Sequence, residues 1–128
     1  QIEREYRTLN DRKSRAIAGL SMGGSESLYV GLTTADRFAW IGAFSTGGLG
    51  ENLDQQLAEM KTKDASTLEL LWIACGTDDH LIETNRKIRE WLTSKGIKHT
   101  DIETPGAHTW MVWRRNLATF APLLFQGK

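Results

Sequence analysis

The sequence predicts an α/β fold in which helices flank a parallel sheet. Short apolar runs alternate along the chain with segments whose apolar residues recur at helical spacing, and strands separated by helices are expected to be parallel. The polar residues suited to chemistry follow the apolar runs, so they fall at the C-terminal ends of strands, where ligands bind in such sheets. A length of 128 residues, with 40% hydrophobic and 25% charged residues, suits one globular domain.

Four strands and five helices follow from the apolar patterns. The expected strands cover residues 16–20, 40–45, 70–76 and 97–103. The expected helices are an amphipathic segment over 2–9, residues 22–33, a segment with Leu53, Leu57 and Met60 on one face, a segment with Leu81, Ile88, Trp91 and Leu92 ended by Gly96, and a last helix with Trp110, Trp113, Leu117, Phe120 and Leu124 in its stripe. The glycine-rich loop 46–51 follows the second strand and would border a site at that edge.

A Gly-x-Ser-x-Gly motif, Gly19-Leu20-Ser21-Met22-Gly23, joins the first strand to the following helix. In such a nucleophile elbow the serine lies on a strained turn, and small residues two before and two after it let strand and helix approach. The turn exposes the Ser21 hydroxyl at the helix N-terminus, where the unpaired Met22 N–H can receive an oxyanion. The motif therefore predicts Ser21 as a nucleophile; an ordinary N-cap serine is the alternative.

A serine nucleophile needs a base and a carboxylate that orients the base, and the chain supplies both in the order acid, then histidine. Asp78 and Asp79 follow the third expected strand, and either could act as the acid or cap the next helix. His108 follows the fourth strand and is the predicted base. His99 falls within a strand, and His80 opens a helix beside the acid.

The composition argues against several other classes of function. The formal net charge is zero and opposite charges are interspersed, so we expect no binding to nucleic acid or to an anionic membrane. Asp78, Asp79, His80 and Glu83 carry donors for a metal, but a solvated helix start is the favoured interpretation, so no metal and no cofactor are expected. The single Cys75 at a strand end is expected to be a buried, inert thiol. The sequence does not indicate whether the protein is secreted or cytoplasmic.

At these residues the chain resembles the putative esterase family of α/β-hydrolases, which includes feruloyl, acetylxylan, esterase D-type and enterochelin esterases. The resemblance covers nearly the whole chain. Its markers are residues 15–24, Phe44-Ser45, residues 75–79, residues 105–110 and residues 120–125. It implies an α/β-hydrolase fold with Ser21 as nucleophile, Asp79 as the acid and His108 as the base.

The family also carries a comparable length of chain before this region, with the first strands and a loop that donates the second oxyanion N–H. The resemblance therefore implies that residues 1–128 are the C-terminal portion of a single esterase domain. About four strands would be present, and an N-terminal half or another chain would complete the fold. Without it the elbow strand would have an exposed edge.

The predicted activity is carboxylic-ester hydrolysis through an acyl-enzyme on Ser21, with a carbohydrate ester or a feruloyl or acetyl ester as substrate. The alternatives are acyl transfer to a sugar hydroxyl, as in mycolyltransferases, and a non-catalytic carbohydrate-binding or assembly module on the same scaffold. Trp110 could stack on an aromatic acyl group or a sugar, or belong to the core. Leu20 is the second candidate for substrate contact.

Overall fold

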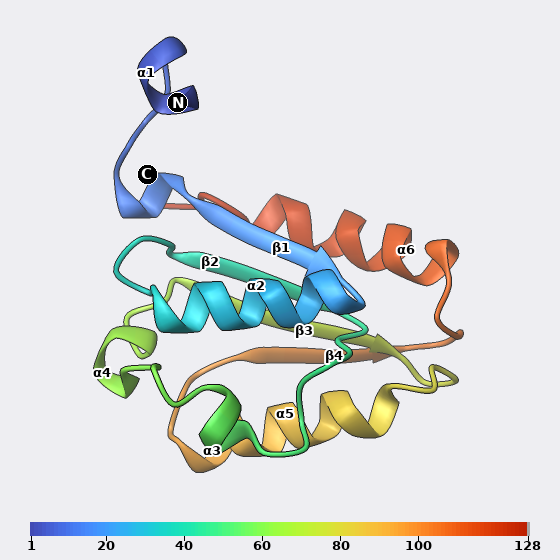
Figure 1. The fold of residues 1–128 in the computed structure, drawn as a ribbon. Helices are drawn as coiled ribbons and strands as arrows, with labels where there is room; N and C mark the ends of the chain where they lie inside the picture. Colours follow the sequence, from blue (N-terminus) through green and yellow to red (C-terminus); the bar gives the residue numbers. More distant parts are fainter. Residues whose placement is uncertain (128) are drawn as a thin grey trace.

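A computed structural model describes residues 1–127, and its centre is a four-stranded parallel sheet (Figure 1). The strands lie in the order β1 (Ala16–Leu20), β2 (Trp40–Phe44), β3 (Leu70–Gly76) and β4 (Thr100–Thr104). Each strand therefore pairs with the next strand along the chain, as expected of strands linked by helices. β1 forms one edge of this sheet, and β4 forms the other.

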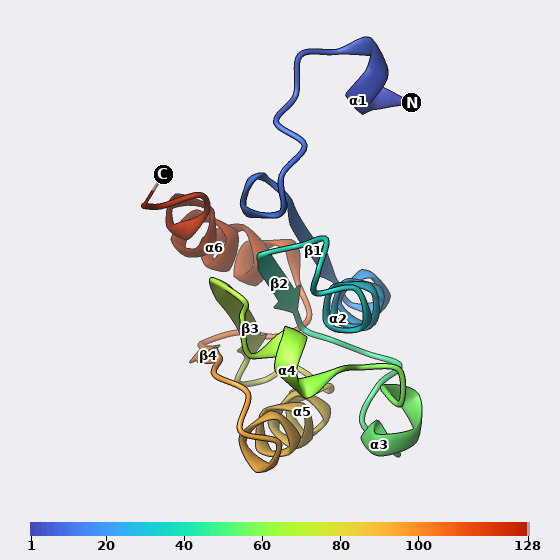
Figure 2. The same cartoon turned by 90° about the vertical axis from the view of Figure 1, so that its left-hand side faces the viewer.

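Helices cover both faces of the sheet. Helices α2 (Met22–Thr33) and α5 (Ile82–Ser94) lie on one face, and α6 (Trp110–Phe120) crosses the other, as the two orthogonal views show (Figures 1 and 2). Three short helices, α3 (Leu53–Gln56), α4 (Thr62–Ala65) and the 3₁₀ turn η2 (Ala121–Leu123), lie in the connections and after α6. No helix in residues 1–127 is long and apolar enough to cross a bilayer.

The two faces carry separate apolar clusters. Alternate residues of a strand point to opposite faces, so Ile41 and Ile73 pack with Leu28 and Leu92 on the side of α2 and α5. Strand residues that alternate with these point to the opposite face. There Phe44, Trp72 and Ala74 form a second cluster with Phe120 of α6. A sheet covered in this way has nearly continuous apolar strands at its centre, and every residue of β2 is buried.

The N-terminal helix is much shorter than the predicted 2–9. Helix α1 covers Ile2–Glu5 and ends at Tyr6 in extended backbone, and Figure 2 shows it projecting away from the body. Ile2, Tyr6 and Leu9 are 61–68% exposed, so no tertiary contact covers the apolar stripe that predicted the helix. A short helix without such packing is marginal in water. The turn residue Asp11 instead caps a 3₁₀ turn, η1 (Arg12–Ser14).

The helix predicted around Leu53, Leu57 and Met60 is reduced to the single turn of α3, and α4 begins only after Met60. Leu53 and Leu57 are buried as expected, but Leu57 already ends α3 with φ −114° and ψ 30°. Burial of these leucines beside the core therefore needs only one helical turn. The periodicity correctly identified the apolar contacts and wrongly extended the helix.

The fourth strand begins at Thr100, three residues later than predicted. Ile97 instead belongs to the end of α5, where its N–H donates to the Leu92 carbonyl and the Gly96 N–H donates to that of Thr93, at 3.0 Å each. Gly96 has φ +70°, so this is a Schellman motif, in which the residue after glycine packs back onto the helix. Ile97 is 2% exposed for that reason, and His99 precedes the strand.

The buried face of the last helix also differs from the predicted stripe. Val112, Asn116 and Phe120 are buried, whereas Trp110 and Leu117 are 72% and 51% exposed. Of the two alternatives for Trp110, the one that places it in the core is therefore wrong for the described chain. Phe120 and Trp113 of the predicted stripe do pack on the apolar cluster of this face of the sheet, so the stripe is only partly buried.

Candidate active site

Ser21 forms a strained turn between β1 and α2. Its φ is +54° with ψ −119°, a conformation that side chains rarely adopt and that persists only where surrounding contacts enforce it. The Ser21 N–H donates to the Phe44 carbonyl at 2.8 Å, and the Ser21 carbonyl accepts from the N–H groups of Gly24 and Gly47 at 3.1 Å each. These bonds tie the turn to the neighbouring strand and to the loop that follows it.

Of the two motif glycines, Gly19 carries the steric requirement. A Cβ at Gly19 would lie 2.2 Å from the Gly23 carbonyl oxygen, whereas a Cβ at Gly23 would meet no atom within 4 Å. The backbone of Gly23 is therefore what Gly19 contacts. A side chain at position 23 would not hinder the close approach of strand and helix. The strand and helix come close because the residue on the strand side is glycine.

Asp79 is held in the turn after β3, in a position that depends on another close backbone approach. A Cβ at Gly76 would lie 2.2 Å from the Gly106 carbonyl oxygen, and that oxygen accepts from the Asp78 N–H at 2.9 Å. The loops that carry the acid and His108 are thus fastened together. Asp79 is 2% exposed, while Asp78 is exposed to solvent.

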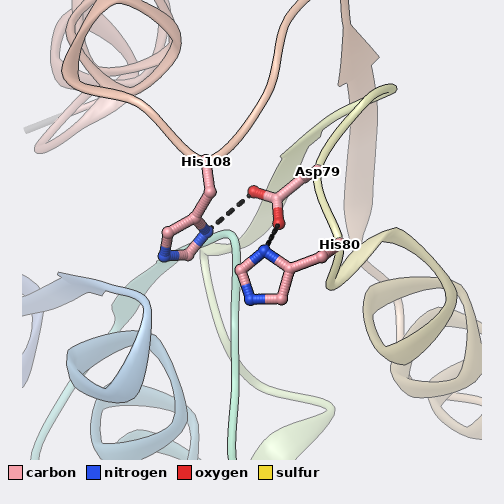
Figure 3. A group of neighbouring side chains, drawn as sticks. All are labelled: Asp79, His80 and His108. Atoms are coloured by element: carbon pink, nitrogen blue, oxygen red, sulfur yellow. Dashed lines mark hydrogen bonds and ion pairs between the residues drawn. The ribbon is translucent and has the colours of Figure 1, made fainter.

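Three side chains far apart in the sequence meet at the C-terminal edge of the sheet. His108 Nδ1 lies 2.9 Å from Asp79 Oδ2, and His108 Nε2 lies 3.1 Å from Ser21 Oγ. Figure 3 shows His108 reaching toward Asp79 from the loop before α6. With Nδ1–H donating to the carboxylate, Nε2 is the nitrogen free to accept the serine proton, which is the arrangement that a general base requires.

The surroundings of Asp79 favour the ionised carboxylate. Burial would raise the pKa of Asp79, but hydrogen bonds from the Leu81 N–H, the Ser45 side chain and His108, together with the charge of His108, lower it below its usual value. The Leu81 N–H contacts Oδ1 at 2.9 Å. Asp79 can therefore remain an anion opposite the imidazole although its side chain is shielded from water.

His80 lies beside the same carboxylate. Its Nδ1 is 3.6 Å from Asp79 Oδ1, and Figure 3 shows each imidazole facing a different oxygen of Asp79. Donor atoms of Asp79, His80 and His108 all lie within 4.8 Å of one another. A metal held by these atoms would have to replace the Asp79–His108 hydrogen bond. The expectation that no metal is held here stays a prediction. Glu83, the fourth residue considered from the sequence, accepts a hydrogen bond from Arg86.

The Met22 N–H begins α2 and has no carbonyl one turn before it within the helix. It follows Ser21 directly, as an oxyanion donor in an elbow must. The assignment of Met22 remains a prediction, since no second donor has been identified in residues 1–127. The Met22 side chain is 70% exposed.

Leu20 and Trp110 line one apolar hollow of about 540 Å³ between β1 and α6. Phe44, Trp113 and Leu117 are among its other walls, but Ser21, Asp79 and His108 are not. The two candidate substrate-binding residues thus share a surface beside the reactive side chains rather than around them. Their role in substrate contact stays a prediction.

Several polar residues around the site were given no role of their own by the sequence, although Ser45 belongs to a family marker and Trp113 to the last helix's stripe. Ser45 and Thr46 are fully buried, and the Asn85 side chain accepts from the Thr46 N–H and donates to its carbonyl, at 3.1 Å each. Trp113 packs edge-to-face on His108 with ring centroids 4.8 Å apart. Ser45 directly follows a strand, as Ser21 does, so its place at the C-terminal end of a strand could have identified it. Asn85 and Trp113 lie within helices, where the sequence offers no comparable indication.

Cys75 is buried at the end of β3, as expected for an inert thiol. Burial is the main reason that the pKa of Cys75 is raised to about 12, and the neighbouring Asp79 charge adds to this. A thiol with that pKa has almost no thiolate near neutral pH and is a poor nucleophile. Ser21 is therefore the better-placed nucleophile of the two.

The sheet, the elbow and the three-residue cluster together define an α/β-hydrolase fold with a serine, a histidine and an aspartate at the strand ends. Residues 1–124 match the family model described as "Putative esterase". The chain belongs to that family, as the sequence motifs predicted.

The relatives that the chain matches are named as esterases. It is 29% identical over 126 residues to an endo-1,4-beta-xylanase/feruloyl esterase of Xylanibacter ruminicola, covering 98% of this chain and 16% of that protein. It is 25% identical to an acetyl esterase of Caldicellulosiruptor saccharolyticus, covering 84% of this chain and 53% of that protein. A solved ferulic acid esterase from Anaeromyces mucronatus superposes with a TM-score of 0.81 and 28% identity, covering 97% of this chain and 48% of that one. The chain thus spans about half or less of each relative.

Proposed function

We propose that the protein is a serine carboxylic-ester hydrolase whose acyl-enzyme forms on Ser21. The observation that carries this proposal is the pair of contacts of His108, with Nε2 3.1 Å from Ser21 Oγ and Nδ1 2.9 Å from Asp79 Oδ2. Both distances are within hydrogen-bond range, so proton transfer from the hydroxyl needs no rearrangement of the chain.

In the proposed reaction, Ser21 Oγ attacks the ester carbonyl carbon while His108 Nε2 takes its proton. Asp79 stabilises the resulting imidazolium and keeps the ring in the required tautomer. Collapse of the tetrahedral intermediate breaks the bond to the alcohol oxygen, which leaves with the proton from His108. Water then attacks the acyl-enzyme by the same steps, releasing the acid and restoring the Ser21 hydroxyl.

The Met22 N–H is the proposed donor to the oxyanion of each tetrahedral intermediate. One such donor is worth about 3 kcal/mol to a transition state, and α/β-hydrolases use a second donor from a separate loop. We place the second donor outside residues 1–127. The chain taken alone should then be slower than the complete protein by about a hundredfold or more.

The proposed substrates are esters of acetyl or feruloyl groups on carbohydrate. Relatives named as feruloyl and acetyl esterases support this class, and the fungal relative has been solved in complex with ferulic acid. Among the described residues, the exposed indole of Trp110 offers a flat aromatic surface near the reactive side chains. We propose Trp110 and Leu20 as contacts for the acyl or sugar group.

Labelling of the complete protein with a fluorophosphonate probe tests the proposed nucleophile directly. The expected result is one covalent adduct on Ser21 and none in the Ser21→Ala variant. A complete, folded protein that resists labelling would favour the alternative of a carbohydrate-binding or assembly module. Product analysis with methyl ferulate, acetylated xylan, short aryl esters and a siderophore ester, with and without a sugar acceptor, then separates hydrolysis from acyl transfer.

We further propose that residues 1–128 form the C-terminal portion of a single hydrolase domain. β1 pairs only with β2 in the described sheet, and the adjoining hollow leaves Trp110, Met111 and Leu117 more than half exposed. An edge strand beside apolar side chains is a surface that another strand of the same domain would cover. Slower amide exchange of β1 in the complete protein than in the 128-residue chain is expected; equal exchange would contradict this proposal.

A further inference from the structure

A buried hydroxyl links α6 to the acid of the candidate active site. Ser45 is 0% exposed, and its Oγ accepts a hydrogen bond from Trp113 Nε1 at 2.9 Å. We propose that Trp113 and Ser45 are positioning residues that hold Asp79, and through it His108, in reactive geometry. This inference rests on the proposed function, since it concerns the same three reactive side chains.

The Trp113 contact determines which way the Ser45 hydroxyl can donate. An indole N–H is a donor only, and a serine hydroxyl has one proton and two acceptor sites. Ser45 Oγ must therefore be the acceptor toward Trp113, and its own proton is left to point elsewhere. Trp113 in this way orients a group that could otherwise rotate freely.

In this proposal, the acceptor for that proton is the Asp79 carboxylate. A hydrogen bond from Ser45 is one of the interactions that lower the Asp79 pKa against its burial. Cys75 also neighbours Ser45, but its pKa is raised to about 12, chiefly by burial, so it is a neutral thiol. A charged oxygen accepts more strongly than neutral sulfur. The Leu81 N–H and His108 Nδ1 contact the two oxygens, Oδ1 and Oδ2, at 2.9 Å each, and the proposed Ser45 bond adds a third donor to this carboxylate.

The backbone of Ser45 keeps its hydroxyl at this point despite strain. Ser45 has φ +48°, and its N–H continues the sheet ladder by donating to the Ala74 carbonyl at 2.7 Å. A non-glycine residue in this conformation costs on the order of 1 kcal/mol or more. Glycine would remove that cost, so a role for the side chain is the reason to have serine here.

Trp113 also contacts the base itself. Its ring meets that of His108 edge-to-face, with centroids 4.8 Å apart and planes at 90°. One side chain therefore touches His108 by its ring and Ser45 by its N–H. These two contacts of Trp113 set the distance between the His108 ring and the Ser45 hydroxyl.

The test uses Ser45→Ala, Ser45→Gly and Trp113→Phe in the complete protein, with thermal unfolding to confirm folding. Each should lower kcat for an aryl ester, roughly ten- to a hundredfold for the serine variants, with KM little changed, as when a bond to a charged group is removed. The glycine variant relieves backbone strain, so an equal loss in both serine variants assigns the effect to the hydroxyl. Parent-like kcat in both would overturn the proposal.

A double variant separates positioning from general packing. If Trp113 acts through Ser45, then Trp113→Phe should cost less than about twofold in the Ser45→Ala background, because the shared link is already absent. Fully multiplicative losses would contradict the chain of contacts. Trp91→Phe in α5 is the matched control. It also removes an indole hydrogen bond, which Trp91 Nε1 donates to Asp54 Oδ1 at 3.0 Å. It should leave kcat unchanged.

Two measurements need no turnover and keep this inference distinct from the proposed function. The Asp79 pKa, followed by carboxyl NMR, should rise in both serine variants, and the low-field Nδ1–H proton signal of His108 should move. A parent protein that does not react with a fluorophosphonate would refute the nucleophile while these signals still report on Ser45. Signals identical to those of the parent would refute the positioning role whether or not the esterase activity is found.

Discussion

Ser21 and Ser45 end neighbouring strands with similar backbone strain but different surroundings. Their φ angles are +54° and +48°. Each N–H donates to a carbonyl of the next strand, that of Phe44 for Ser21 and that of Ala74 for Ser45. Ser21 is half-buried with its Oγ 3.1 Å from His108, whereas Ser45 is fully buried behind the acid. A positive φ at the end of a strand therefore accompanies one hydroxyl that faces the site and another that is enclosed.

The residue two positions before each serine explains much of this difference. Gly19 and Ala43 are partners in the sheet register. Gly19 lets the start of α2 contact the strand, since a Cβ there would lie 2.2 Å from the Gly23 carbonyl oxygen. After Ser45 the chain enters a loop, and Ala43 is accommodated. A strained serine is thus suited to nucleophilic attack only where a helix begins directly after it.

The largest effect should come from removing the exposed hydroxyl. Ser21→Ala is expected to lower kcat for an aryl ester by about 10⁶-fold, the loss typical of a serine nucleophile, and to abolish labelling by a fluorophosphonate. Ser94→Ala, at the end of α5 and away from the site, serves as the control. Acylation that continued in Ser21→Ala would remove Ser21 from its proposed role.

The two neighbouring carboxylates, Asp79 and Asp78, provide the second comparison. Asp79→Asn should lower kcat by about 10⁴-fold, because an amide can stabilise the wrong tautomer of the imidazole. Asp78→Asn, one residue earlier and exposed, should change kcat less than about twofold, as is usual for surface positions. Similar losses in the two variants would argue that the turn, and not the Asp79 carboxylate, matters.

The glycine before Ser21 can be tested by stability alone. Gly19→Ala should lower the free energy of unfolding by about 2–3 kcal/mol, since a methyl group would overlap backbone that cannot move independently. Gly23→Ala should be neutral or raise it by about 0.5 kcal/mol, because its Cβ meets open space within a helix. Chemical denaturation of both variants measures the difference, and equal destabilisation would contradict the steric asymmetry.

Glycine at either serine tests the backbone strain. Ser21→Gly and Ser45→Gly should each unfold with about 1 kcal/mol more free energy than the corresponding alanine variant, because alanine retains the unfavourable φ. Comparing glycine with alanine cancels the loss of the hydroxyl in each pair. A difference at Ser21 but none at Ser45 would place the strain in the elbow alone.

Acid should produce the smallest effect, through Asp79. Its folded pKa is lowered, so its contribution to stability is complete above the ordinary value of 3.8 and is lost as the pH falls through the lower folded value. The stability of Asp79→Asn should therefore depend less on pH below 3.8 than that of the parent. Denaturation at a series of acidic pH values checks this, with Asp78→Asn expected to follow the parent curve.

Much of the fold followed from local patterns because its strands are apolar runs bounded by turns. The spans 16–20 and 70–76 coincide with β1 and β3. One error lies where helical spacing alone had to decide burial, because the 2–9 segment packs against nothing in residues 1–127. The other is a strand start, because Ile97 closes the end of α5 after Gly96 and does not begin β4.

The sequence alone determined the order of strands and helices and the residue types at the strand ends, because alternation, glycine positions and motif spacing are local properties of a chain. It left Asp78 and Asp79 equivalent by position, and it placed Trp113 in an apolar stripe without any sign of its contacts with His108 and Ser45. The resemblance to the esterase family implies Asp79, but only the tertiary structure shows which carboxylate meets the imidazole, since the contact of Gly76 with Gly106 brings Asp79 to His108. Burial and hydrogen-bond partners arise between segments 29 to 87 residues apart, and no local pattern encodes those distances.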